Sequence, residues 1–286
     1  KTMPQTKNEE AIFILNGDER TFSTKGSAPF KYGEDKVLST ASTDITFNQP
    51  WYDRGYAALD FLDDEEFRAL KNGITQSIAA IVSKECSVAT DGFTLEKYHQ
   101  FVQGDAEHYK VIARTRDLFA EDFSFPIMDL IPRFEKLMGM GLTDIIPDSQ
   151  LKAHIIVRIN RPQSNDFNPP HKDIYQRVDS KGIVGGFVNF WIPIAGVNEK
   201  SSLPLVPQSH HLKESQILRT FDRGTINGNS YSVRMVKSWN GKNDLVRSTV
   251  KDGQVLIFSG HLIHGLAVND NEDLTRVALE FRLFKA

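Results

Sequence analysis

Several features that this chain lacks narrow its function before any motif is considered. Cys86 is the only cysteine, which excludes an internal disulfide and any zinc or iron–sulfur site built on several thiolates. No apolar run approaches the roughly 20 residues that span a bilayer, and the first residues contain no signal-peptide core. A metal ion, if the protein holds one, must therefore be bound by histidines and carboxylates.

An excess of charge of one sign is also lacking. The 34 Lys and Arg residues nearly match the 37 Asp and Glu residues, so the net charge is only −3. Such a composition favours neither nucleic acid nor an anionic membrane as a partner, and a small molecule becomes the leading substrate class. We expect a soluble, cytoplasmic protein whose targeting segment, if there is one, precedes Lys1. The oligomeric state stays open.

The first half of the chain carries helical patterns. Residues 1–50 are typical of a lead-in segment with one or two strands. From Asp63 onward, apolar residues recur at spacings of three and four, and Asp63 and Glu66 stand where an N-cap and its capping-box partner belong. Further helical patterns cover residues 94–103, 107–120 and 126–139. We therefore expect residues 55–150 to be mainly helical support.

After residue 150 the apolar period falls to two, which indicates strands. The segments are AHIIVRIN, GGFVNFWIPI, YSVRMV, GQVLIF and TRVALEFRLF, separated by turn-forming residues. Helices followed by antiparallel strands favour an α+β fold in which helices, mainly from the N-terminal half, cover one face of a sheet sandwich or barrel such as a jelly roll. No repeat or linker divides the sequence, so we expect residues 1–286 to form one domain, with residues 151–286 supplying the jelly-roll strands.

The segment NPPHKDIY places an imidazole and a carboxylate two positions apart. Residues i and i+2 of a strand point to one side, so His171 and Asp173 could direct a nitrogen and an oxygen at one point. Pro169 and Pro170 cannot donate hydrogen bonds to a ladder, which suits the edge of a sheet or the mouth of a barrel. The pair alone is weak evidence for a metal site, because H-x-D arises often by chance and a polar sheet edge also explains it.

A third ligand is offered by VLIFSGHLIHGLAVND, where His264 follows an apolar strand and precedes Gly265. Two histidines and one carboxylate form the facial triad of non-haem Fe(II) oxygenases, which leaves three octahedral positions open. His261, three residues earlier and on the opposite side of a strand, is the competing ligand. Both histidines could also be loop residues that make ordinary hydrogen bonds.

The last strand favours the metal site. TRVALEFRLF places Arg276, Ala278, Glu280 and Arg282 on one face and apolar residues on the other. A buried arginine is costly unless it meets an anion, and a guanidinium matches a carboxylate through two parallel hydrogen bonds. The competing explanation for Arg276 is an ion pair with Glu280 on the same face.

With H-x-D, His-Gly and a later arginine in this order, the chain resembles the Fe(II)- and 2-oxoglutarate-dependent dioxygenase superfamily. The likeness is greatest to the phytanoyl-CoA hydroxylase-like group, because the segments FWIPIAGVNEKSSLPLVPQSHHL and FLDDEEFRAL of this chain resemble segments of that group. The resemblance covers roughly residues 55–284 and implies a core that is a double-stranded β-helix, a cupin-like jelly roll. By position, the resemblance implies that His171, Asp173 and His264 bind iron. It also implies that Arg276 holds the distal carboxylate of 2-oxoglutarate.

Two departures from that group's pattern fall in residues 190–212. Gln208 stands where a glycine is customary, and SSLP replaces a turn that contains glycine, so the resemblance does not fix the path of this loop. His210 lies in the same segment, and the resemblance implies a structural role for it rather than metal binding.

The resemblance implies Fe(II), 2-oxoglutarate and O₂ as cofactor and cosubstrates, with ascorbate as an aid in vitro. 2-Oxoglutarate is decarboxylated to succinate and CO₂ while a C–H bond of a small molecule is oxidised by hydroxylation, desaturation or ring closure. In halogenating relatives Gly or Ala replaces the carboxylate ligand, so Asp173 argues against halogenation. We expect the substrate to be an amino-acid-like or carboxylated specialised metabolite.

Residues that contact the substrate are harder to identify. Arg158 lies on the strand before the H-x-D pair and is the first candidate for a substrate carboxylate or phosphate, with a surface ion pair as the alternative. Tyr175, Trp191 and Arg282 are further candidates, and Asn189 is a candidate contact of the cosubstrate. Core packing or ion pairing is the competing explanation for each of them.

Two other functions stay open. A nucleic-acid or protein demethylase of the same superfamily is suggested by the spacing of Arg276 and Arg282, but the sequence has no basic cluster suited to a polyanion. The second alternative is a jelly-roll metal-binding protein without catalysis or without 2-oxoglutarate. Release of succinate from 2-oxoglutarate would distinguish an oxygenase from this alternative.

Overall fold

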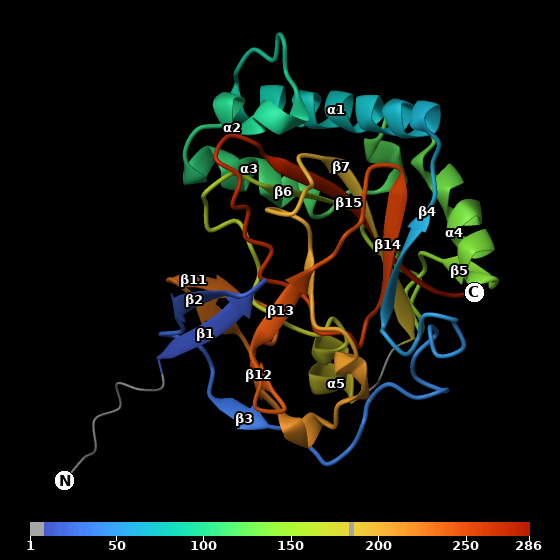
Figure 1. The fold of residues 1–286 in the computed structure, drawn as a ribbon. Coiled ribbons are helices and arrows are strands. Elements are labelled where there is room, and N and C mark those ends of the chain that lie inside the picture. The colour runs from blue at the N-terminus through green and yellow to red at the C-terminus, as the bar shows by residue number, and fades with distance from the viewer. Residues whose placement is uncertain (1–8, 183–185) are drawn as a thin grey trace.

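The fold is α+β, with helices packed along one side of a large sheet and smaller sheets on its other side (Figure 1). A computed structural model describes residues 9–182 and 186–286. The helices are α1 Asp64–Cys86, α2 Tyr98–Phe101, α3 Asp105–Thr115, α4 Leu130–Met138 and α5 Tyr175–Lys181. Of these, only α5 follows residue 150, so the predicted helical first half is confirmed.

Helix α1 begins and is buried as its sequence predicts. The Asp63 side chain accepts from the Glu66 N–H at 2.8 Å, and the Glu66 side chain accepts from the Asp63 N–H at 3.1 Å, which completes the capping box. The helix ends at Cys86, and the C-cap residue Ser87 adopts a left-handed conformation. Its apolar stripe is buried, and the buried residues are Leu70, Ile74, Ile78, Ile81 and Val82.

The later helices are shorter than their patterns. The pattern over 107–120 gives α3, which ends at Thr115, because Leu118 exchanges two backbone hydrogen bonds with Ile155 and the chain must leave the helix to reach it. The pattern over 94–103 gives a 3₁₀ turn followed by the single turn of α2. Within the described ranges, none of the helices is long and apolar enough to cross a membrane.

The largest sheet has the strand order β4-β14-β7-β15-β5, and β6 also pairs with β15. All of its pairings are antiparallel. Its strands are β4 Tyr56–Asp60, β5 Leu142–Thr143, β6 Ile156–Asn160, β7 Phe187–Ala195, β14 Gln254–Ser259 and β15 Arg276–Lys285. The strands predicted for AHIIVRIN, GGFVNFWIPI, GQVLIF and TRVALEFRLF are therefore confirmed.

This sheet has two faces of opposite character. On its outer face, apolar residues of β15 pack with the helices in one core cluster, which includes Val277, Leu279, Phe281 and Leu283 together with Ile74 and Phe134. On its inner face the alternate residues of β15 are Arg276, Ala278, Glu280 and Arg282. Register places Trp191 opposite Glu280 and Asn189 opposite Arg282. The outer face therefore carries the core, and the inner face gathers polar and charged groups.

The smaller sheets join the lead-in segment to the C-terminal half. Their orders are β2-β1-β13-β8, β12-β9-β3 and β10-β11. The strands are β1 Glu10–Leu15, β2 Asp18–Ser23, β3 Phe30–Tyr32, β8 Pro204–Leu205, β9 Ile217–Thr220, β10 Gly224–Ile226, β11 Asn229–Tyr231, β12 Val236–Trp239 and β13 Asp244–Arg247. The lead-in thus contributes three strands rather than the one or two predicted.

One predicted strand, YSVRMV, is wrong. Tyr231 ends β11 and Val236 begins β12, and the chain between them makes no regular ladder. Arg234 forms an ion pair with Asp179 at 3.2 Å, and the Met235 N–H donates to the Thr220 hydroxyl at 3.0 Å. These side-chain contacts replace the ladder that the alternating pattern predicted.

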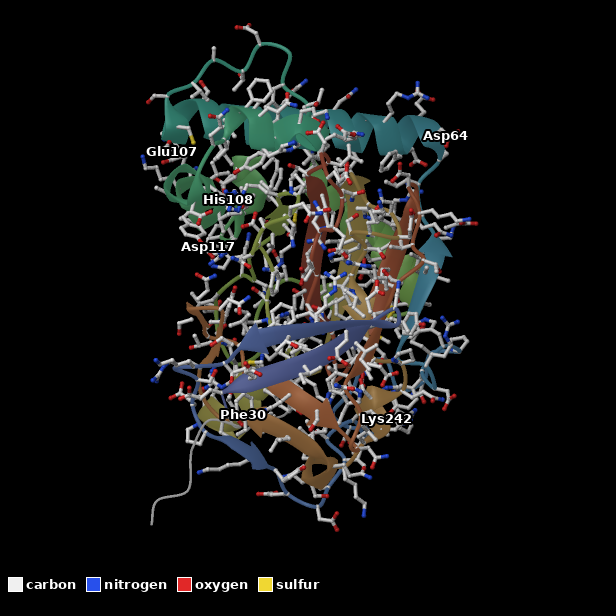
Figure 2. All side chains as sticks on the ribbon, turned by 60° about the vertical axis from the view of Figure 1, so that its left-hand side comes forward. Phe30, Asp64, Glu107, His108, Asp117 and Lys242 are labelled. Atoms are coloured by element: carbon white, nitrogen blue, oxygen red, sulfur yellow. The ribbon has the colours of Figure 1, made fainter. Side chains whose placement is uncertain are left out.

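Side chains fill the space between the helices and the sheet, for example around His108 of α3 (Figure 2).

Candidate metal centre

Three side chains that are far apart in the sequence converge on one point. His171, Asp173 and His264 each offer one ligand atom, and these atoms lie within 4.8 Å of one another. Nε2 of His171 is 3.0 Å from Oδ1 of Asp173, and Nε2 of His264 is 3.4 Å from Oδ2 of Asp173. Ligands about 2.1 Å from an octahedral ion and at right angles to each other lie about 3 Å apart. The spacing therefore suits a small divalent ion with three ligands on one side.

Backbone pairing positions the two histidines. The His171 N–H donates to the His264 carbonyl at 2.9 Å, and the His264 N–H donates to the His171 carbonyl at 3.1 Å. The two imidazole ring centres are 4.5 Å apart. Leu205 of β8 forms a further bridge with His264. The histidines are therefore held by main-chain contacts as well as by their own side-chain packing.

The H-x-D pair does not lie on a strand, as its spacing had suggested. His171 forms an isolated bridge, Asp173 follows in a turn, and α5 begins at Tyr175. The Tyr175 N–H donates to the Lys172 carbonyl at 3.2 Å and closes this turn. The side chains of His171 and Asp173 still meet because the chain turns between them. Because the turn continues to Tyr175, the Tyr175 side chain does not point toward the same place.

Hydrogen bonds select the imidazole nitrogens that face Asp173. Nδ1–H of His171 donates to the Pro169 carbonyl at 2.7 Å, and Nδ1–H of His264 donates to the Leu262 carbonyl at 3.0 Å. Each Nε2 therefore carries the free lone pair that a metal ion needs. Burial lowers the pKa of His264 to about 4, although Asp173 opposes this effect, so the ring is unprotonated at neutral pH.

The carboxylate is held from two further sides. Nδ2–H of Asn189 donates to Oδ2 of Asp173 at 2.6 Å, and Nη2 of Arg282 lies 3.1 Å from Oδ1. Burial alone would raise the pKa of Asp173, but Arg282, His264 and His171 outweigh it and hold that pKa well below its ordinary value. Asp173 is therefore an anion wherever the protein is folded near neutral pH.

The backbone conformation at Gly265 and the space around it require a glycine after the second histidine. Its φ is +130°, which a residue with a side chain rarely adopts. A Cβ atom there would lie 2.6 Å from the Pro169 carbonyl oxygen and 3.0 Å from Cα of Pro170. The His-Gly pair and the Pro-Pro pair, which are separate signals in the sequence, thus pack directly against each other at the metal centre.

His261, the competing ligand, and His210, for which the resemblance implies a structural role, both lie elsewhere. Nε2 of His261 is 3.2 Å from the Thr43 carbonyl, and His261 is not a member of the converging group. Nε2 of His210 is 2.6 Å from the Tyr52 carbonyl in the loop that contains Gln208. Gln208 itself has a φ of +66°, which accounts for the glycine customary at that position.

Arg276 is a buried cation with no anion of its own. Only 2% of the residue is exposed, and in the described part of the chain no carboxylate pairs with it. Its Nη2 donates to Oδ1 of Asn160 at 2.8 Å and its Nη1 to the Ser201 carbonyl at 3.4 Å, while Nε has no partner among the described residues. The guanidinium lies 5.3 Å from the Trp191 ring centre. It is therefore oriented but not neutralised.

The alternative ion pair between Arg276 and Glu280 is wrong. Glu280 instead accepts from Nε of Arg158 at 2.9 Å, because β6 places Arg158 beside Ala278 on the neighbouring strand. Burial, together with the charges of Arg158 and Arg247, lowers the pKa of Arg276 to about 9. The protein thus bears an energetic cost at Arg276 that only a bound anion would offset.

The SSLP turn belongs to this cationic site. The hydroxyl of Ser201 donates to the Gly196 carbonyl at 2.6 Å and accepts from the Asn198 N–H at 3.0 Å, so the turn closes without an internal glycine. Its Ser201 carbonyl is the one that faces Arg276. Asn160 and Ser201 are partners of Arg276 that the sequence did not identify, since neither carries a motif.

The remaining predicted contacts fall in three places. Arg158 is paired with Glu280 on the inner face, and Trp191 lies beside Arg276. Tyr175 is fully buried in the core, with the Arg219 guanidinium 3.7 Å from its ring centre. Asn189 and Arg282 contact Asp173, as described above.

A buried ionic cluster lies behind the H-x-D turn, and we call it the β9 clamp: Lys172, Tyr175, Asp179, Glu214 and Arg219. Lys172, between the two predicted ligands, donates to Glu214 at 3.0 Å, and its side chain is 0% exposed. Arg219 of β9 binds both carboxylate oxygens of Asp179 in α5 at 2.9 Å. No local pattern predicts this cluster, because its partners lie on separate elements.

Comparisons with known proteins place the chain in a family. The family description Phytanoyl-CoA dioxygenase (PhyH) matches residues 51–278. No curated protein matches the sequence. Among solved structures, EctD from S. alaskensis with 2-oxoglutarate and 5-hydroxyectoine is 13% identical with a TM-score of 0.49, covering 92% of this chain and 86% of that chain.

Two further solved structures are similar to this chain to about the same degree. AviO1 from Streptomyces viridochromogenes Tue57 is 15% identical with a TM-score of 0.44, covering 86% of this chain and 97% of that chain. SnoK, a non-heme alpha ketoglutarate dependent carbocyclase from nogalamycin biosynthesis, is 12% identical with a TM-score of 0.45, covering 89% and 88%. Likenesses of this degree are too distant to indicate a function. The family match covers most of the sequence, and the chain belongs to the Phytanoyl-CoA dioxygenase (PhyH) family.

Proposed function

We propose that this protein is an Fe(II)- and 2-oxoglutarate-dependent oxygenase that oxidises a C–H bond of a small molecule. The observation that carries the proposal is the convergence of His171, Asp173 and His264, with both Nε2 atoms and the carboxylate directed at one point. Membership of the Phytanoyl-CoA dioxygenase family supports it. The donor set fits Fe(II), because two imidazoles and one carboxylate leave the opposite three positions open.

The roles of the three ligands follow from their surroundings. His171 and His264 present Nε2 because their Nδ1–H groups are bound to backbone carbonyls. Asp173 supplies the anionic ligand, and Asn189 fixes the rotation of its carboxylate. When bound, iron with 2-oxoglutarate and O₂ supplies the oxidising power, and 2-oxoglutarate is decarboxylated to succinate and CO₂. The protein's own groups hold the ligands and orient the substrates.

Arg276 is the proposed partner of the distal carboxylate of 2-oxoglutarate. It is buried on the same face of β15 as Arg282, which contacts Asp173, and no described carboxylate pairs with it. Asn160 and Ser201 hold its guanidinium so that further N–H groups remain free. Trp191 beside it limits where a bound molecule can lie. A dicarboxylate would offset the cost of burying this cation, which a neutral ligand would not.

The proposed reaction is the oxidation of a C–H bond, without a choice among its possible products. Hydroxylation, desaturation and oxidative ring closure all begin from C–H oxidation, and Asp173 as a carboxylate ligand argues against halogenation. The proposed substrate is an amino-acid-like or carboxylated metabolite. Arg158 and Arg282 are the proposed substrate contacts, since both side chains lie on or beside the inner face and are about one-third exposed, at 30% and 32%.

We also infer a jelly-roll core formed by one domain. The main-chain bridges of His264 with His171 and Leu205 connect segments of facing sheets, as a double-stranded β-helix requires. Strands of the lead-in segment pair with strands of the C-terminal half, β1 with β13 and β3 with β9. A domain boundary between the lead-in and the rest would have to break these pairings.

Succinate release tests the proposed activity directly. Purified protein is supplied with Fe(II), ascorbate, 2-oxoglutarate and air, and we expect slow uncoupled succinate formation even without the substrate. His264→Ala should abolish iron binding and succinate release. His261→Ala is the matched control, since it removes a buried histidine of the same segment that lies outside the ligand group, and it should retain both.

Other results would favour the alternatives. Iron binding without any succinate would favour a metal-binding protein that lacks this catalysis. Loss of iron binding in His261→Ala but not in His264→Ala would overturn the ligand assignment. Succinate release stimulated by a methylated oligonucleotide or peptide, and by no small molecule, would favour a demethylase.

A further inference from the structure

Around the proposed metal centre, positively charged side chains outnumber negatively charged ones. Three guanidiniums, those of Arg158, Arg276 and Arg282, lie with two carboxylates, those of Asp173 and Glu280. Arg247, which also acts on Arg276, is held separately by Asp270 and two backbone carbonyls. Among these guanidiniums and carboxylates, the inner face therefore has one positive charge in excess.

Binding of the proposed cofactor and cosubstrate leaves this excess unchanged, because the two charges of Fe(II) equal those of the 2-oxoglutarate dianion. This step rests on the proposed function. Arg276 then faces the distal carboxylate, and Arg158 keeps Glu280 at 2.9 Å. Asp173 and the other carboxylate of 2-oxoglutarate neutralise the iron. The positive charge that remains belongs to Arg282.

Arg282 is placed to use that charge beside the metal. Its Nη2 is 3.1 Å from Oδ1 of Asp173, its Nε is 3.4 Å from Oδ1 of Asn189, and the guanidinium lies 4.7 Å from the Phe187 ring centre. Nη1 makes no hydrogen bond within the described residues, and 32% of the side chain is exposed. The guanidinium is thus fixed on two sides and has free donors within reach of a ligand.

We propose that the substrate carries an acidic group, an oxyanion such as a carboxylate or a phosphate, that binds to Arg282. A guanidinium in a partly buried site prefers an oxyanion to any neutral oxygen, because the charge strengthens each hydrogen bond. Since Arg282 is one contact away from a metal ligand, the oxidised carbon lies within about four bonds of the acidic group. This names the class of substrate, and it makes Arg282 a determinant of specificity.

A different role for Arg282 is to orient Asp173 alone. Asn189 already makes the shorter contact with that carboxylate, at 2.6 Å. If orientation were the only role, replacing Arg282 would weaken metal binding and would not alter the preference among substrates. The two roles therefore predict different measurements.

The test uses the zinc-loaded protein with 2-oxoglutarate, in which zinc has no redox chemistry and ligands bind without turnover. The probes are N-acyl amino acids, aryl carboxylic acids and phosphate monoesters up to 10 mM, each measured by calorimetry beside its neutral amide or alcohol. We expect at least one acid to bind at least tenfold more tightly than its neutral counterpart. The carboxylate and phosphate arms identify which oxyanion is preferred.

Two variants connect this preference to Arg282. Arg282→Met should remove the preference for the acid, and Arg282→Lys should keep part of it. Arg177→Met is the matched control, because Arg177 of α5 lies over Phe284, 5.6 Å from its ring centre, much as Arg282 lies over Phe187. It should keep the full preference. Zinc and 2-oxoglutarate affinities are measured for every variant.

Each possible result supports or overturns the proposal that an acidic group of the substrate binds to Arg282. Neutral probes that bind as tightly as the acids, an acid preference that survives in Arg282→Met, or no acid binding at 10 mM would each overturn the inference while leaving the proposed oxygenase intact. Failure of the wild-type protein to bind zinc or 2-oxoglutarate would instead remove the proposed function, and this inference with it.

Discussion

Two buried cations, Lys172 and Arg276, differ in how they are neutralised. Lys172 has a side chain that is 0% exposed and meets Glu214, itself only 5% exposed, at 3.0 Å. Arg276 is equally buried, but within the described part of the chain its hydrogen bonds go only to an amide oxygen and a backbone carbonyl. Burying a charge is costly in both cases, yet only Lys172 has an internal anion. The difference separates a cation that supports the structure from one that is available to a ligand.

The paired cation should matter most to stability. Lys172→Met leaves the buried Glu214 carboxylate with only the more distant Arg219 guanidinium, whose Nε lies 3.8 Å from Oε1, and we expect it to lower the free energy of unfolding by about 3 kcal/mol. Lys172→Met/Glu214→Leu removes both charges and should recover most of that loss. Urea denaturation followed by circular dichroism measures both. A double variant no more stable than the single one would mean that the ion pair is not what the single variant loses.

The unpaired cation should behave in the opposite way. Arg276→Met removes a charge that has no internal anion, so we expect the protein to be as stable as the wild type or more stable. The 2-oxoglutarate concentration required for succinate release should rise roughly 30-fold or more, because one partner of a buried charge pair is lost. Arg282→Met should raise that requirement far less. An equal rise in both variants would contradict the assignment of Arg276.

The β9 clamp allows a finer comparison. Lys172 lies between two predicted ligands, and Arg219 holds α5, which begins just after Asp173. We expect the double variant Lys172→Met/Glu214→Leu to bind Co(II) about ten- to a hundredfold more weakly than wild type, although its stability is largely restored. Lys172→Arg should bind Co(II) nearly as wild type does. Unchanged Co(II) affinity in the double variant would limit the clamp to a role in stability.

The smallest effect should come from changing the shape of a paired cation and keeping its charge. Arg219→Lys loses the two parallel bonds to Asp179 and the contact with the Tyr175 ring, but it leaves every carboxylate with a cation. We expect a loss of about 1 kcal/mol in the free energy of unfolding. A loss as large as that of Lys172→Met would show that geometry, rather than neutralisation, governs this cluster.

The sequence predicted what depends on local spacing. The capping box of Asp63 and Glu66 and the two faces of β15 follow from periods of 3.6 and 2, and both are present in the structure. YSVRMV alternates as a strand does, yet contacts of Arg234 and Met235 with other elements divide it. A local pattern does not contain information about such partners.

In the candidate site, too, some features follow from the local sequence and others depend on distant partners. The grouping of His171, Asp173 and His264 was expected from their order, although the H-x-D pair lies in a turn and not on a strand. The partners of the charged residues were not expected, because they depend on register. Glu280 meets Arg158 because β6 aligns with that part of β15, and Lys172 meets Glu214 from a separate segment. Pairing between strands decides these contacts, and no single segment encodes it.

The mutual main-chain bonds of His171 and His264 have a consequence for when the proposed iron could bind. The two residues lie in segments far apart in the sequence, and β14, the strand before His264, pairs with β7 in the largest sheet. A growing or partly folded chain presents one histidine and one carboxylate, which bind iron weakly and release it readily. The proposed iron would therefore bind to the completed fold, and we expect the folded protein to form without the metal.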